Sequence, residues 1–204
     1  MDILKGMLKM KQEILERIKA LGGNIDNVKG NSLKEDLQKI KFSNPLYPKS
    51  FAEDLYGVDE FYEKHKNMYL ENKDLFYKNI GDHYFSDHEI PYGQSFFRNF
   101  LFTPFKEGSE DFGELDEITT EDEIREVIKC DELDFMCICY SYGFPDHYFI
   151  CLGDSNQSNP VVYSTDHEEF FTAINHKKNL EDFFKRFLTK EEFLDIVKDY
   201  LENR

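Results

Sequence analysis

The 204-residue chain has no tryptophan, four cysteines, six prolines and eleven glycines. No stretch approaches the ~18 uninterrupted apolar residues of a membrane-spanning helix, so we expect no membrane partner. Lys5, Lys9 and Lys11 interrupt every apolar run near the start, which argues against a secretory signal. We therefore expect a cytoplasmic protein.

Sequence motifs of several enzyme classes are also absent. The chain has no G-x-G-x-x-G or G-x-x-x-x-G-K phosphate loop, no G-x-S-x-G nucleophile turn and no H-E-x-x-H metal motif. With so few glycines, little material remains for any phosphate-binding loop. We expect no enzymatic activity and no cofactor.

Charge of one sign dominates the chain. Forty-one acidic residues stand against twenty-five basic ones, a net charge of −16, which argues against nucleic acid or an anionic membrane as partner. Residues 107–134 hold thirteen acidic residues against two basic ones, whereas residues 1–50 are net positive. Such a run is either a solvated face or a docking surface for a basic protein.

The twenty phenylalanines and twelve tyrosines are too many for an acidic disordered chain, so we expect a folded core. Cys137 and Cys139 alternate in a strand-like run. A hairpin turning near residues 143–146 would place Cys137 opposite Cys151. A disulfide there is uncommon in the cytosol, and zinc sites usually space their cysteines more widely, so we favour small buried hydrophobic side chains.

The N-terminal half reads as helical. Apolar residues at near-helical spacing predict an amphipathic helix over residues 3–18, stopped by Gly22–Gly23. Its basic face suits either a membrane surface or the acidic rest of the chain, and we favour the latter. A capping box at Ser32 starts a second helix. Residues 58–77 indicate one or two more, with His65 as a core histidine.

Residues 95–105, "SFFRNFLFTPF", fit a buried strand or a short helix, ended by Pro104. A capping box at Thr120 predicts a short acidic helix over residues 121–129.

Strands are expected at 135–140, 148–152 and 161–163, paired antiparallel because the loops are short. Asn179 and Thr189 begin two C-terminal helices. The sequence thus predicts one α+β domain with a central, largely antiparallel sheet flanked by helices and a helical N-terminal half.

Four of the six histidines follow an aspartate. In the expected hairpin, Asp146 and His147 approach Asp166 and His167. This arrangement leaves open a metal-dependent enzyme, although Asp-His dipeptides are also ordinary turn chemistry.

The stretch "YFICLGDSNQSNPVVYSTDHEEFF" resembles the C-terminal core of the SUKH superfamily, the Smi/Knr-type proteins. The shared pattern is an apolar strand (148–152), a Gly/Asp-rich turn (153–159), a strand ending in V-Y, a D-H-E tripeptide (166–168) and a helix with Leu180, Phe183 and Phe184. The segment 112–124 is similar to the G-L-x-x-I region of the family. The resemblance covers residues 110–202 and leaves residues 1–105 as a divergent N-terminal elaboration.

The resemblance implies a non-enzymatic bacterial immunity protein that binds and neutralises a cognate polymorphic toxin with a basic surface, such as a nuclease. A regulatory scaffold of Smi/Knr type is the alternative. Asp166 would cap the following helix. The residues expected to contact the toxin are Glu114, Asp116, Glu117, Glu121, Asp122, Glu123, Asp154 and Asn156.

Overall fold

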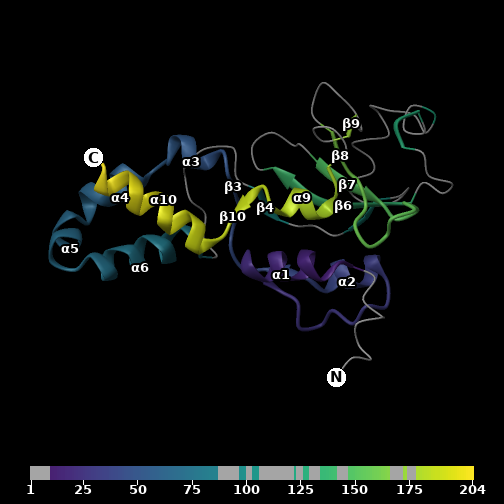
Figure 1. Ribbon diagram of the computed structural model, residues 1–204, viewed down its shortest axis with the longest axis horizontal. Helices are drawn as coiled ribbons and strands as arrows, with labels where there is room; N and C mark the ends of the chain where they lie inside the picture. The colour runs from purple at the N-terminus through teal and green to yellow at the C-terminus, as the bar shows by residue number, and fades with distance from the viewer. Residues whose placement is uncertain are drawn as a thin grey trace.

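The computed structural model describes residues 10–86, 97–99, 103–105, 122, 126–128, 134–141, 147–165, 172–173 and 178–204. Helices and antiparallel sheet are combined in one chain, so the predicted α+β fold is confirmed. Two lobes lie next to each other: one holds the main sheet with helices α1, α2 and α9, and the other is helical (Figure 1).

The main sheet has the strand order β4-β6-β7-β8-β9, with β5 also paired to β6, and every pairing is antiparallel. The strands span β4 (Phe97–Asn99), β5 (Thr103–Phe105), β6 (Phe135–Ser141), β7 (His147–Cys151), β8 (Val162–Thr165) and β9 (Thr172–Ala173). The three strands predicted from the sequence are confirmed as β6, β7 and β8.

Strand β6 lies inside the sheet and is covered on both faces. Its residues from Phe135 to Cys139 are all at most 4% exposed, as expected for an apolar run without alternation. In the β6–β7 ladder Cys137 lies opposite Phe149 and Phe135 lies opposite Cys151, and a β-bulge between Cys137 and Cys139 shifts the register by one residue nearer the turn. The expected pairing of Cys137 with Cys151 is therefore wrong. Cys137, Cys139 and Cys151 are all buried, as favoured.

The ambiguous stretch before the acidic segment forms strands. β4 and β5 both pair with β6, so the helical alternative is excluded for these residues. Pro104 lies inside β5 opposite Met136 and does not end the element as predicted. A strand paired on one side tolerates proline, because the missing N–H can lie on the open side.

Helices α1 (Gln12–Ala20), α2 (Leu33–Lys39) and α9 (Leu180–Phe184) pack on the sheet lobe. The buried face of α1 is Ile14, Leu15 and Ile18, which confirms the predicted inward packing. Gly22, at φ +91°, follows the C-terminal cap of α1, and a Cβ there would clash with Asn44 Oδ1. The two-residue strands β1 (Gly23–Asn24) and β2 (Lys41–Phe42) pair beside these helices.

The helical lobe contains five helices among the described residues. They span α3 (Phe51–Asp54), α4 (Val58–Lys64), α5 (Lys66–Glu71), α6 (Lys73–Tyr84) and α10 (Lys190–Glu202). The predicted one or two helices in residues 58–77 are in fact α4, α5 and the start of α6. The Asn72 side chain caps α6 by accepting the N–H of Leu75. His65 packs its ring 4.4 Å from the ring of Phe61.

The chain crosses between the lobes twice at one place. Strand β3 (Tyr47–Pro48) pairs antiparallel with β10 (Phe187–Leu188). Arg17 on α1 adds a third link, because its guanidinium donates to the Phe187 carbonyl and to both carboxylate oxygens of Glu192 at the start of α10. Each lobe therefore combines N-terminal and C-terminal segments. None of the described helices has the length and apolar character needed to cross a membrane.

Candidate functional site

The polar turn between β7 and β8 holds two of the predicted contact residues. Asp154 accepts the N–H of Asn156 with Oδ1 (2.8 Å) and the N–H of Val161 with Oδ2 (3.0 Å). Asn156 Oδ1 accepts the hydroxyl of Ser158 at 2.9 Å. Both side chains thus stabilise the turn, and Asn156 is also exposed.

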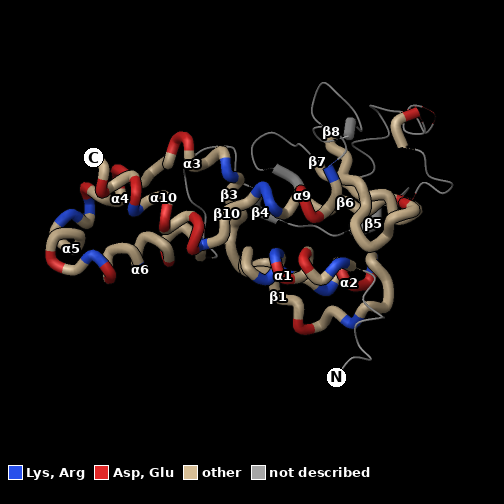
Figure 2. Tube along the Cα trace, viewed as in Figure 1, with Lys and Arg blue, Asp and Glu red and all other residues tan. Residues whose placement is uncertain are grey.

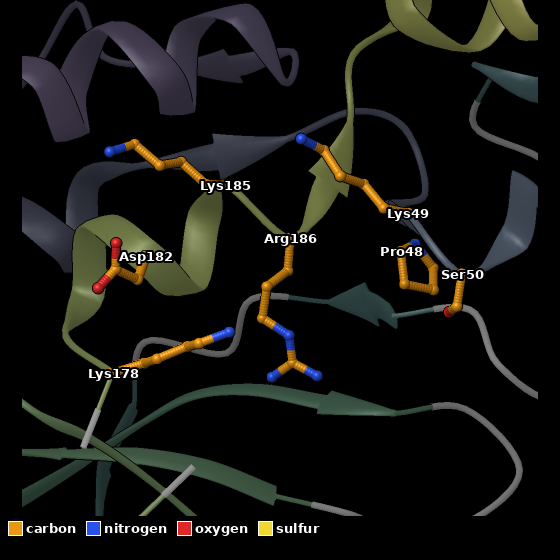
Figure 3. Close-up of a pocket in the computed structure, with 7 residues that line it drawn as sticks. All are labelled: Pro48, Lys49, Ser50, Lys178, Asp182, Lys185 and Arg186. Carbon is orange, nitrogen blue, oxygen red and sulfur yellow. The ribbon is translucent and has the colours of Figure 1, made fainter. Parts of the chain in front are cut away.

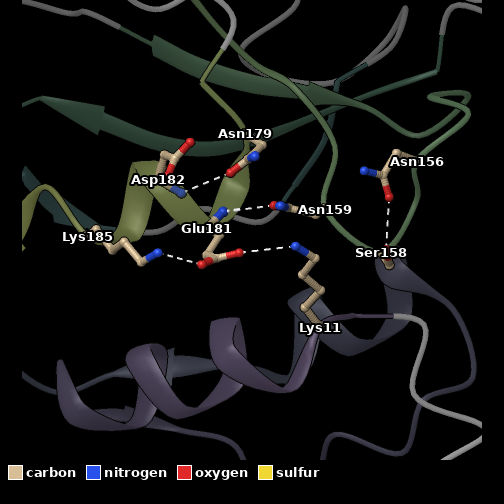
Figure 4. Close-up of polar contacts among 8 residues, drawn as sticks. All are labelled: Lys11, Asn156, Ser158, Asn159, Asn179, Glu181, Asp182 and Lys185. Atoms are coloured by element: carbon tan, nitrogen blue, oxygen red, sulfur yellow. Dashed lines mark hydrogen bonds and ion pairs between the residues drawn. The ribbon is translucent and has the colours of Figure 1, made fainter.

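The same turn joins two helices. The Ser158 carbonyl accepts the backbone N–H of Lys11 at 3.0 Å, and buried Asn159 accepts the N–H of Glu181 at 2.9 Å (Figure 4). The carboxylate of Glu181 accepts hydrogen bonds from the side chains of Lys185 and Lys11, and these hydrogen bonds lower the pKa of Glu181. The turn is therefore a junction that fixes α1 and α9 against the sheet.

Only part of the predicted acidic surface lies in the described residues. Asp122 and Glu126 are helical and exposed, in keeping with a short acidic helix there. The Asp134 carboxylate lies 3.7 Å from Lys34 Nζ, which joins the end of this segment to α2. The remaining predicted contact residues lie outside the described residues, as does the expected cap Asp166. They are Glu114, Asp116, Glu117, Glu121 and Glu123.

A cationic cavity of about 520 Å³ opens at the junction of the lobes. Figure 2 shows lysine and arginine positions near β3, β10 and α9. The cavity is lined by Pro48, Lys49, Ser50, Lys178, Asp182, Lys185 and Arg186 (Figure 3).

A backbone hydrogen bond joins the β3 side of the cavity to the segment that follows α9. The N–H of Lys49 donates to the carbonyl of Arg186 at 2.7 Å, continuing the β3–β10 pairing. Sequence reasoning missed this site, because Lys49 is far along the chain from the other cations. The density of basic residues in 177–186 was the one available signal.

The charges in the cavity differ in how they are neutralised. Lys185 is paired with Glu181. Within the described part of the chain, Lys49, Lys178 and Arg186 form no ion pair, and Nη1 of Arg186 is buried without a hydrogen-bond partner. Among the described lining residues, these three cations thus outnumber the carboxylate of Asp182.

The Asp-His pairs are only partly described. Asp82 pairs with Lys190 at 2.6 Å, and this hydrogen bond lowers the pKa of Asp82. The His83 ring packs 5.2 Å from Phe61. His147 pairs with Thr165 through the β7–β8 ladder, while Asp146, Asp166 and His167 lie outside the described residues. Across the described ranges, no group of three or more potential ligands is arranged to hold a metal ion.

Comparison of the chain with protein-family models, with curated proteins and with solved structures found no match.

Proposed function

We propose that this chain is a non-enzymatic immunity protein of SUKH type, which binds a cognate protein toxin in the cytoplasm and neutralises it. One observation carries the proposal: in the segment that resembles the family, β7, the polar turn and β8 follow one another in the order that the resemblance implies, and α9 follows after the additional short strand β9. β7, β8 and α9 all contribute to one core, in which the Tyr148 and Phe183 rings lie 5.1 Å apart.

Charge supplies a second line of support. A toxin that binds nucleic acid needs a cationic cleft, because its substrate is a polyanion. The net −11 of residues 107–134 suits such a cleft, and Asp122 and Glu126 of this segment are exposed. Opposite charge of this density steers encounter and raises the association rate by roughly 10- to 1,000-fold.

Neutralisation also requires affinity. Binding at a nanomolar Kd corresponds to about 12 kcal/mol, which rim charges seldom supply. Aromatic anchors that become buried beside the acidic segment would provide the rest. In this proposal the acidic residues set the rate and the choice of partner, and the aromatic contacts set the lifetime of the complex.

Charge reversal tests the proposal. A variant with six acidic residues changed to lysine is titrated against the toxin encoded by the adjacent gene, with binding measured by calorimetry at low salt. The six are Glu114, Asp116, Glu117, Glu121, Asp122 and Glu123. At roughly 0.5 kcal/mol for each lost charge pair, Kd rises on the order of 100-fold.

A matched control reverses six exposed acids of the helical lobe, which changes the net charge equally. These are Glu53, Asp54, Glu60, Glu63, Glu71 and Asp199. The control keeps the wild-type Kd if the acidic segment is the docking surface. Unchanged toxin affinity in the first variant contradicts the acidic docking surface. If a pull-down with the tagged chain recovers a cell-envelope or signalling protein in place of a toxin, the result favours the regulatory scaffold.

A further inference from the structure

The cationic cavity between β3 and α9 is unusual for a chain of net charge −16. Lys178 and Arg186 line the same cavity, and in Figure 3 the Lys178 side chain extends toward the Arg186 guanidinium. Among the described residues, no carboxylate is paired with either cation. The two like charges repel each other, and an anion placed between them relieves the repulsion.

The hydrogen bonding of the Arg186 guanidinium also favours a bound anion. Nη1 of Arg186 is buried without an acceptor, and a buried charged donor without a partner destabilises the folded protein. The arginine side chain is long and flexible, so a small rotation would give Nη1 an acceptor if an anion filled the cavity. The planar fork of arginine matches two oxygens of one anion.

We propose that this cavity binds a small molecule that carries a phosphate group, with the phosphate held by Lys178 and Arg186. This inference goes beyond the proposed immunity function and does not depend on it. It rests on the shape and charge of a site that the acidic segment does not include.

The charge balance favours a phosphate over a single carboxylate. Among the described lining residues, Lys185 is neutralised by Glu181, and the other three cations outweigh Asp182 to leave a charge of +2. A phosphate monoester carries about −1.5 to −2 at pH 7.

The dimensions favour a small molecule over a polymer. A volume of about 520 Å³ lies within the roughly 300–1,000 Å³ of small-molecule sites. The acidic chain repels an extended polyanion, whereas a small anion responds to charges within about one Debye length, ~8 Å at physiological salt. Ser50 adds an exposed hydroxyl at the rim.

The test titrates the full chain with inorganic phosphate and with AMP at physiological ionic strength, using calorimetry and ³¹P NMR. The double variant K178Q/R186Q removes the two central cations. K39Q/K41Q is the matched control, because it removes the same charge from a second cavity of about 360 Å³, whose described lining includes lysines but no arginine.

We expect saturable binding by the wild type, weakened about tenfold or more in K178Q/R186Q and less than about twofold in K39Q/K41Q. Tighter binding of AMP assigns the site to an organic phosphate, and equal binding assigns it to free phosphate. If R186Q does not fold, K178Q alone is compared with K39Q. Absence of saturable binding by the wild type, or equal weakening in both variants, overturns the proposal.

Discussion

The two hydrophobic cores of the molecule use different side chains. The core of the sheet lobe is mainly aliphatic, with Ile, Leu, Met and Val around a few phenylalanines. The core of the helical lobe is mainly aromatic and centres on Tyr47, Phe76, Tyr84 and Phe193. The Tyr84 and Phe193 rings lie 4.8 Å apart, and Phe76 lies 5.1 Å from Tyr69.

The two cores differ because short helices depend more on side-chain packing than a hydrogen-bonded sheet does. The sheet gains its ladder of backbone hydrogen bonds, so many medium-sized side chains suffice. Helices α3–α6 are short, and such helices are marginal without tertiary packing. Large rings bury more surface per residue, and the Tyr47 hydroxyl also donates to the Tyr84 carbonyl at 2.7 Å. The helical lobe thus depends on fewer, larger side chains.

The largest expected effect is therefore at Phe193, which is fully buried in the helical core. We expect Phe193→Ala to lower the free energy of unfolding by about 3–5 kcal/mol, measured by denaturant titration. Hydrogen exchange should rise more in α4–α6 than in β6 and β7. Phe193→Leu is the control and should lose clearly less. A loss below about 1 kcal/mol in the alanine variant would contradict the dependence of the helical lobe on its large aromatic side chains.

Leu37 gives the matching test in the sheet lobe, where it is also fully buried. Leu37→Ala should cost about 2–4 kcal/mol, because other aliphatic side chains surround the cavity that it leaves. Here hydrogen exchange should rise more in β6 and β7 than in α4–α6. Equal loss of protection in both lobes would show that the two cores open as one unit.

Arg17 tests the link between the cores. Arg17→Met should lower the free energy of unfolding by about 1.5–3 kcal/mol, because the Phe187 carbonyl and the Glu192 carboxylate lose a charged donor. Lys19→Met is the control on the same helix, since Lys19 is exposed. Equal stability losses in the two variants would show that Arg17 does not join the lobes.

The same ion pair predicts a pH dependence. Burial opposes ionisation of Glu192, but hydrogen bonds from Arg17 and from the Thr189 N–H outweigh it and lower its pKa. A carboxyl with a lowered folded-state pKa stabilises above its unfolded pKa of about 4.3 and loses this contribution as pH falls through the folded value. Wild-type stability should therefore fall more steeply below about pH 4.5 than that of Glu192→Gln. Parallel curves would contradict this assignment.

The smallest effects are expected at the helix caps. Thr189 caps α10 with a complete capping box, and Asn179 caps α9 in the other lobe. Each alanine substitution should cost about 1 kcal/mol in chemical unfolding. The Thr189 variant should open the helical lobe first, and the Asn179 variant the sheet lobe. The reverse order would argue against separate cores.

The sequence predicts what depends on neighbouring residues. The caps at Ser32, Asn179 and Thr189 are confirmed because the cap and its N–H partner lie three residues apart. The sequence predicts strand β6 because a strand buried on both faces is a continuous apolar run without polar alternation. The turn at Asp154 was recognised by composition, and its hydrogen bonds now explain why Asp and Asn occupy it.

What the sequence does not predict depends on distant partners. The register of β6 and β7 places Cys137 opposite Phe149 and not Cys151, and no local pattern fixes that register or signals the bulge beside it. The pairing of Tyr47 with Leu188 joins two-residue strands too short to show a period. The sequence does not predict the cationic cavity for the same reason, because the β3–β10 pairing brings Lys49 next to Arg186.

The proposed toxin neutralisation is tested most directly by titrating the product of the neighbouring gene, the candidate toxin, with the purified chain and measuring its activity. We predict that toxin activity falls to the background level at one equivalent and that the six-residue charge reversal restores activity at the same ratio. Toxin activity that persists at a large excess of the folded chain would contradict the account.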